Sequence, residues 1–200
     1  MGATFTNISF YRADSRKIAE ALRNERVRKC FISPALGNWV TVYDENASFH
    51  TAASWLARAI CRACQVAAIV ISVEDSDYLK YSAVDSSGSV VDESIPRQEP
   101  GTREDRHGLV GDLGKMLSTF ELKDKTAALR EALERETVLA DHCAQELARV
   151  LGIRNITFGC CYLLEDWHEL AGDLVGRDAF LYLNSRGEIE NAVASAELQS

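Results

Sequence analysis

The chain has 200 residues, of which 46% are hydrophobic, 8% aromatic and 26% charged. This composition is typical of a folded, water-soluble protein and excludes a disordered, collagenous or membrane-embedded chain. The 30 acidic residues outnumber the 22 basic ones, and the net charge of −8 disfavours nucleic acid as a partner.

Two features of the sequence predict a cytoplasmic protein. The first residues lack the basic segment and apolar core of a secretory signal. The longest aliphatic run, residues 66–71, is far shorter than the ~20 residues that a membrane span needs. Six cysteines in such a chain are expected to be reduced thiols, and we expect no membrane partner.

The first 95 residues predict alternating strands and helices. Residues 4–11 have the pattern of a strand, and a helix follows from a cap at Asp14 or Ser15 to Arg28. A loop containing Pro, Gly and Asn joins two β-prone runs at 28–33 and 39–44, which predicts a hairpin. The remaining predicted elements are a helix over 48–65, a buried strand over 67–73 and a hairpin of 78–84 with 89–93.

The order of these elements, βαββαβββ, predicts the fold class. Its first six members match the split βαβ, or ferredoxin-like, arrangement, in which two helices cover one face of an antiparallel sheet. We therefore predict an α+β fold: a ferredoxin-like antiparallel sheet with an added hairpin and a mainly helical C-terminal half. The uncovered face of the sheet needs a partner, and residues 109–200 are the candidate.

The C-terminal half is predicted to be a helical subdomain packed on the first domain, which spans residues 1–95. Residues 96–108 combine prolines with charged side chains and are interpreted as a linker. Apolar spacing then predicts helices over 109–120 and 126–151, the second one ended by Gly152. Residues 156–168 fit a helix better than a strand, and residues 179–183 and 188–191 predict a terminal hairpin.

Charge is distributed unevenly along the chain. Residues 1–30 hold seven basic groups and three acidic ones, and most of the basic groups fall on the first predicted helix. This excess of basic residues has two interpretations. One is a docking patch, either for an anionic partner or for the acidic body of a second copy, and the other is a solvated helix face.

Acidic residues gather where predicted strands end. Asp44 and Glu45 end one strand, and Asp75 and Asp77 follow another. If the two pairs converge, they offer oxygen ligands for Mg²⁺ or Ca²⁺, and these four residues are the candidate binding residues. The alternative is that they form turns, because Asp hydrogen-bonds its own backbone at strand ends.

Other residue types offer little catalytic chemistry. Cys61 and Cys64 form a CxxC near the C-terminal end of a predicted helix, where the helix dipole disfavours a thiolate, so we interpret them as apolar thiols. The sequence has no nucleophile elbow, phosphate-binding loop or HExxH motif, and the four histidines are interpreted as surface or capping residues. We expect no cofactor.

Three segments carry a resemblance to known proteins: GNWVTVYDE at 37–45, DSDYLKY at 75–81 and GSVVDE at 88–93. Over residues 5–95 the chain resembles a family of uncharacterised bacterial cytoplasmic proteins. The resemblance implies a bacterial cytoplasmic protein and assigns no functional residue. After GSVVDE the chain continues with SIPR, where such proteins continue with an aromatic, cysteine-containing stretch.

Two functional hypotheses follow from the sequence. The first is a non-enzymatic binding or protein-interaction module, such as an immunity-like inhibitor or a ligand sensor, that uses a sheet edge and the basic first helix to bind another protein or a second copy. The second is a metal-assisted hydrolase built on Asp44, Glu45, Asp75 and Asp77. The absence of catalytic motifs favours the first.

Overall fold

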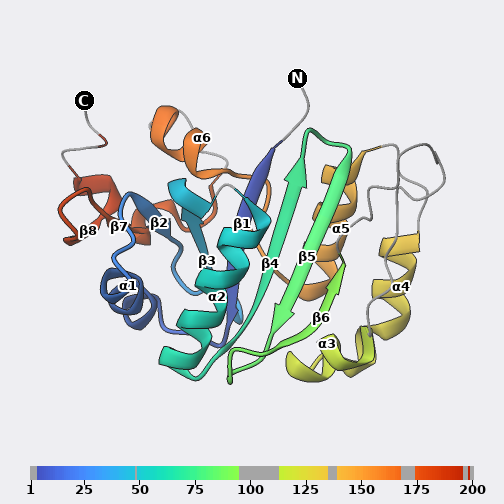
Figure 1. The fold of residues 1–200 in the computed structure, drawn as a ribbon. Coiled ribbons are helices and arrows are strands. Elements are labelled where there is room, and N and C mark those ends of the chain that lie inside the picture. The colour runs from blue at the N-terminus through green and yellow to red at the C-terminus, as the bar shows by residue number, and fades with distance from the viewer. Residues whose placement is uncertain are drawn as a thin grey trace.

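The computed structural model of the chain describes residues 4–47, 49–94, 113–134, 139–167, 174–195 and 198. These residues form an α+β fold around an eight-stranded antiparallel sheet with the order β6-β5-β4-β1-β3-β2-β7-β8 (Figure 1). The strands are β1 (Phe5–Tyr11), β2 (Cys30–Ile32), β3 (Trp39–Asp44), β4 (Ala67–Glu74), β5 (Tyr78–Val84), β6 (Val90–Ser94), β7 (Leu181–Leu183) and β8 (Ile189–Asn191). The helices are α1 (Ser15–Asn24), α2 (His50–Cys64), α3 (Leu113–Thr119), α4 (Thr126–Glu134), α5 (Ala140–Leu151) and α6 (Cys160–Glu165).

The elements predicted over residues 4–94 are confirmed, with shifted ends. Asp14 caps α1 by accepting a hydrogen bond from the Lys17 amide at 2.9 Å. The helix ends at Asn24, earlier than predicted, because the chain turns sharply at Arg26, whose φ is +62°. Both predicted hairpins form, β2 with β3 and β5 with β6.

Helices α1 and α2 cover one face of the sheet, here called the first face. Helix α2 contacts β1, β4 and β5, and α1 contacts β2 and β7. Ile18 and Leu22 of α1 and Ile60 of α2 are buried in one core cluster with alternate residues of the strands. Burial of these side chains stabilises the layer by roughly 1.5–3 kcal/mol each.

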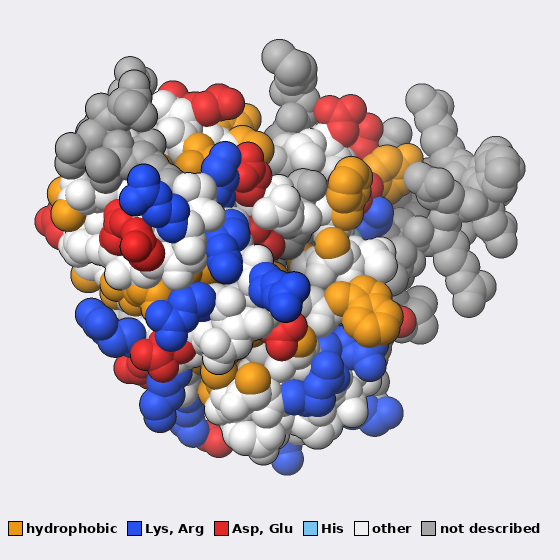
Figure 2. Space-filling model, turned by 60° about the vertical axis from the view of Figure 1, so that its left-hand side comes forward, with side chains coloured by type: hydrophobic (Ala, Val, Ile, Leu, Met, Phe, Trp, Pro, Cys, Tyr) orange, Lys and Arg blue, Asp and Glu red, His pale blue; other side chains and the backbone are white. Residues whose placement is uncertain are grey.

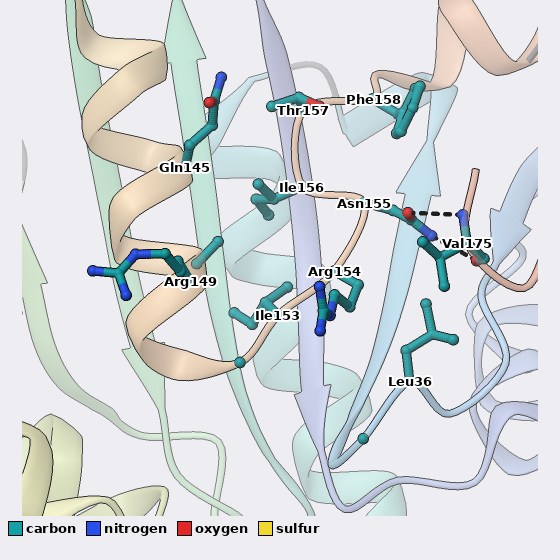
Figure 3. A pocket seen from close by; sticks show the side chains of 13 residues that line it. Leu36, Gln145, Arg149, Ile153, Arg154, Asn155, Ile156, Thr157, Phe158 and Val175 are labelled. Atoms are coloured by element: carbon teal, nitrogen blue, oxygen red, sulfur yellow. Dashed lines mark hydrogen bonds between the residues drawn. The ribbon is translucent and has the colours of Figure 1, made fainter. Parts of the chain in front are cut away.

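The second face of the sheet is covered by the C-terminal half, as the sequence predicts. Helix α5 contacts β4 and β5, α3 contacts β6, and α6 contacts β2. Ile69 and Ile71 of β4 are buried in one cluster with Leu147 of α5 and Met116 of α3. The middle strands β1 and β3 lie between these helices on this face, and the segment that connects α5 to α6 runs across them (Figure 3).

The C-terminal half differs from its prediction in two respects. The single helix expected over 126–151 is two helices, α4 and α5, because Leu139 has an extended backbone with φ −129° and ψ 135°; residues 135–138 lie outside the described residues. The helix expected over 156–168 is confined to Cys160–Glu165, and residues 168–173 are outside the described ranges. Gly152 ends α5 with φ +80°, as expected.

The terminal hairpin is confirmed, but its place in the fold was not predicted. Strand β7 pairs with β2, so the C-terminal half extends the sheet that the N-terminal half begins. The predicted linker at 96–108 lies outside the described residues, and the division into two parts at that point stays a prediction.

The turn between β5 and β6 provides a test of packing against α2. Gly88 has φ +78°, and a Cβ atom there would lie 2.6 Å from the Arg58 carbonyl oxygen. We expect Gly88→Ala to lower the free energy of unfolding by about 2 kcal/mol, because the cost of a left-handed backbone at alanine and the cost of the clash with the Arg58 carbonyl add together. Gly37→Ala is the matched control, since Gly37 has φ +66° but nothing within 4 Å of the added atom. Equal losses in urea denaturation of the two variants would contradict the packing argument.

Candidate functional site

The predicted carboxylates lie at one end of the sheet but do not form a cluster. Asp44 ends β3 and Glu45 follows it, whereas Asp75 and Asp77 lie in the turn from β4 to β5. Strand β1 separates β3 from β4, which places the two strands about 10 Å apart. The described residues contain no group of three or more His, Cys, Asp or Glu side chains that could hold a metal ion. The described residues therefore provide no set of metal ligands for the hydrolase hypothesis.

Asp75 and Asp77 lie in a turn instead, and Asp44 leads into a short 3-10 helix that begins at Glu45. Asp44 is buried, and its Oδ1 accepts a hydrogen bond from the Asn46 amide at 3.1 Å. Burial raises the pKa of Asp44, and the hydrogen bond from Asn46 opposes that shift. Asp75 has φ +51°, and its amide donates to Thr4 Oγ1 at 3.0 Å. Both positions use Asp in the way that strand-end turns commonly do.

His50 lies in a buried polar cluster, which the sequence interpretation as a surface or capping residue missed. Its Nδ1 is 2.9 Å from Ser72 Oγ and its Nε2 is 2.8 Å from Ser82 Oγ. The residue is 5% exposed, and its pKa is lowered to about 4, mainly by burial and also by Lys80, with Glu74 opposing the shift. Because Ser72 and Ser82 are also buried, substrate has no access to either hydroxyl, and the cluster joins α2 to the sheet.

The fold disfavours the thiolate form of both CxxC cysteines, and the cause is burial. Burial raises the pKa of Cys61 to about 12 and also raises the pKa of Cys64. The Cys64 thiol lies 3.8 Å from the Lys17 carbonyl oxygen, which ties α2 to α1. These thiols serve packing between the two helices.

The outer surface of α1 and α2 is basic although the protein is acidic. The two helices carry five basic residues and one carboxylate, Glu20. Figure 2 shows Lys and Arg side chains spread over the side of the molecule to which these helices contribute, with exposed hydrophobic side chains among them. We call this surface the basic helical face, and it comprises Arg16, Lys17, Arg23, Phe49, Trp55, Arg58 and Arg62.

Trp55 is the most distinctive residue of the basic helical face. Its side chain is 66% exposed, and the Arg58 guanidinium lies 5.3 Å from its ring centroid. Arg58 Nε also donates to the Gly88 carbonyl at 3.0 Å, so the β5–β6 turn holds the arginine against the ring. Phe49, which is 71% exposed, precedes the same helix. The sequence does contain a signal for the exposure of Trp55, because this residue falls outside the apolar stripe of its helix.

An open cleft of about 930 Å³ lies on the second face of the sheet. Three separate segments enclose it: the end of α5 with residues 152–158, the turn at 36–37, and Val175 (Figure 3). Its lining residues are Leu36, Gly37, Gln145, Ala148, Arg149, Gly152, Ile153, Arg154, Asn155, Ile156, Thr157, Phe158 and Val175. Sequence reasoning missed this cleft because no local pattern brings these segments together.

Comparison of the chain with protein-family models, with curated proteins and with solved structures finds no match. The resemblance of residues 5–95 to uncharacterised bacterial proteins stays a prediction. No helix among the described residues has the length and hydrophobicity to cross a membrane.

Proposed function

We propose that the protein is a non-enzymatic interaction module that binds an acidic protein through the basic helical face. The observation that carries this proposal is Trp55, a large aromatic side chain that is exposed to solvent yet held by Arg58. Tryptophan and arginine are enriched among the residues that dominate binding energy at protein interfaces. A side chain held before binding also loses less conformational entropy when the partner docks.

Charge favours an acidic partner distinct from the chain itself. Arg16, Lys17 and Arg23 are exposed on α1, which packs against α2. A two-fold symmetric dimer through this face would bring like charges together, which disfavours a second copy. Nucleic acid is disfavoured because the net charge of −8 repels a polyanion that extends beyond the face.

We also propose that the central part of the fold is a ferredoxin-like unit. Its support is the neighbour order β4-β1-β3-β2 with antiparallel pairing throughout, together with α1 and α2 on one face. In this arrangement both helices present their outer surfaces together, which is what a docking face requires.

The proposed interaction is tested with a defined acidic probe and with a captured partner. Poly-L-glutamate is expected to bind the protein in a salt-dependent manner, and Arg16→Glu with Arg23→Glu is expected to abolish this binding. A partner captured from lysate is expected to be acidic. Its affinity, measured with the purified pair by calorimetry, is expected to fall at least tenfold in Trp55→Ala.

Two outcomes would contradict the proposal. One is tighter binding of poly-uridylate than of poly-L-glutamate, which would make the face a nucleic-acid surface. The other is a captured partner whose affinity is the same for the wild type and for Trp55→Ala. Arg154→Ala, on the opposite face of the sheet, is the control variant and is expected to bind the partner as the wild type does.

A further inference from the structure

We propose that the cleft beside Arg154 is a second binding site, for a small ligand that carries an anionic group on an apolar body. It lies on the second face of the sheet, across the sheet from the basic helical face. It does not depend on the interaction proposed for that face. Three observations support the site: a fixed wall, an arginine that has no ion pair with a described residue, and an apolar lining.

The wall formed by residues 151–158 is held by side chains of the sheet. Trp39 Nε1 donates to the Leu151 carbonyl at 2.9 Å, and the Tyr43 hydroxyl donates to the Asn155 carbonyl at 3.0 Å. Asn7 Nδ2 donates to the carbonyls of Ile156 and Phe158 at 2.6 and 2.9 Å. An irregular segment is thus fixed through its carbonyl groups, and its geometry is set before any ligand arrives.

Asn155 joins this wall to the far side of the cleft. Its Oδ1 accepts a hydrogen bond from the Val175 amide at 3.1 Å, and its Nδ2 donates to the Val175 carbonyl at 2.9 Å (Figure 3). Asn155 itself adopts φ +57°, a conformation that asparagine tolerates better than most residues. The two sides of the cleft are therefore linked by a pair of hydrogen bonds.

The charge of the lining favours an anion. The residues that line the cleft include two arginines and no carboxylate. Arg149 is paired with Glu146 at 2.9 Å, whereas Arg154 forms no ion pair with any described residue. Among the described residues, the amides of residues 154–157 donate no hydrogen bond to another backbone group. A guanidinium recognises carboxylates, sulfonates and phosphates.

The remaining lining favours an apolar body on the ligand. Leu36, Ile153, Ile156, Phe158 and Val175 contribute hydrophobic side chains, and Val175 is largely exposed. The cleft volume of about 930 Å³ is within the range of small-molecule sites. An inorganic ion would leave most of this surface exposed to water.

The probe for this site is 8-anilinonaphthalene-1-sulfonate, which carries a sulfonate on an aromatic body. It is expected to bind the wild type with one-to-one saturation and to shift the amide resonances of residues 152–158. Arg154→Ala is expected to weaken binding about tenfold, the effect of losing one hydrogen bond to a charged group. Arg154→Lys keeps the charge and is expected to recover part of the affinity. Arg186→Ala, in the turn between β7 and β8 and outside both proposed sites, is the control and is expected to leave the affinity unchanged.

Three outcomes would overturn the proposal. The first is equal affinity of the probe for the wild type and Arg154→Ala, and the second is a shift of resonances away from residues 152–158. The third is binding of inorganic phosphate as tight as that of the probe, because the apolar lining would then contribute nothing. Failure at this site leaves the interaction proposed for the basic helical face intact, since the two tests use different probes and the two sites lie on opposite faces of the sheet.

Discussion

Lowering the pH from about 7 to about 4 is expected to reduce the free energy of unfolding by about 3 kcal/mol through His50 alone. The neutral imidazole lies between Ser72 and Ser82 in the interior, and its pKa is lowered from 6.5 to about 4. Burial is the main cause and Lys80 contributes, whereas Glu74, which is paired with Lys80 at 2.8 Å, opposes the shift. Protonation of the ring therefore costs more in the folded state than in the unfolded chain.

The direction of the effect follows from proton binding. Between its unfolded and folded pKa values, His50 takes up a proton in the unfolded chain but not in the folded protein, so stability falls as the pH falls. Its contribution is complete above pH 6.5 and is lost as the pH approaches about 4, below which no further loss arises from this residue.

The measurement is urea denaturation across this pH range for the wild type and two histidine variants. His50→Gln removes the titrating group and is expected to flatten the pH dependence of the free energy of unfolding in this range, because only the titration of other groups remains. His142→Gln is the matched control, since His142 is exposed on α5 and is expected to leave the dependence unchanged. The same slope in His50→Gln and in the wild type would show that the imidazole is not held neutral by the fold.

Trp39→Ala is expected to lower the free energy of unfolding by about 4 kcal/mol, the largest effect expected of a single substitution here. The side chain is 2% exposed, and its ring centroid lies 5.1 Å from that of Tyr11 and 5.0 Å from that of Phe120. Truncation leaves a cavity between the sheet and the helices of the second face. It also removes the donor to the Leu151 carbonyl, where the cleft wall begins.

Two further tryptophan variants separate the causes of this loss. Trp39→Phe keeps an aromatic ring but not the indole N–H, and it is expected to cost about 2 kcal/mol. Trp55→Ala is the matched control, because an exposed side chain is expected to change stability by no more than about 0.5 kcal/mol. Similar midpoints in chemical denaturation for Trp39→Ala and Trp55→Ala would contradict the assignment of one tryptophan to the core and the other to the surface.

The two proposed sites use different parts of the same framework. The basic helical face depends on α1 and α2, whose apolar sides are buried on the first face of the sheet. The cleft depends on polar side chains on the second face, where Asn7, Trp39 and Tyr43 hold an irregular segment. A partner on one face and a ligand on the other are both compatible with this layout, because the sheet separates them.

Short-range signals in the sequence predict the local elements over residues 4–94. Each has a short-range physical signal, such as the Asp14 cap of α1 or the turn residues of the two hairpins. The sequence also indicated that the second face of the sheet is covered by the C-terminal half, since an apolar sheet face needs a partner. The basic excess on α1 was equally visible, because charge can be counted along the chain.

Tertiary structure alone decided the placement of distant segments. The pairing of β7 with β2 joins residues far apart in the chain, and no local pattern specifies it. The burial of His50 depends on serines from two strands, and the cleft depends on carbonyl groups of residues 151–158 that meet side chains of β1 and β3. These features arise from non-local hydrogen bonds, whose partners become neighbours only when the chain folds. Periodicity in the sequence predicts local elements and therefore does not predict these hydrogen bonds.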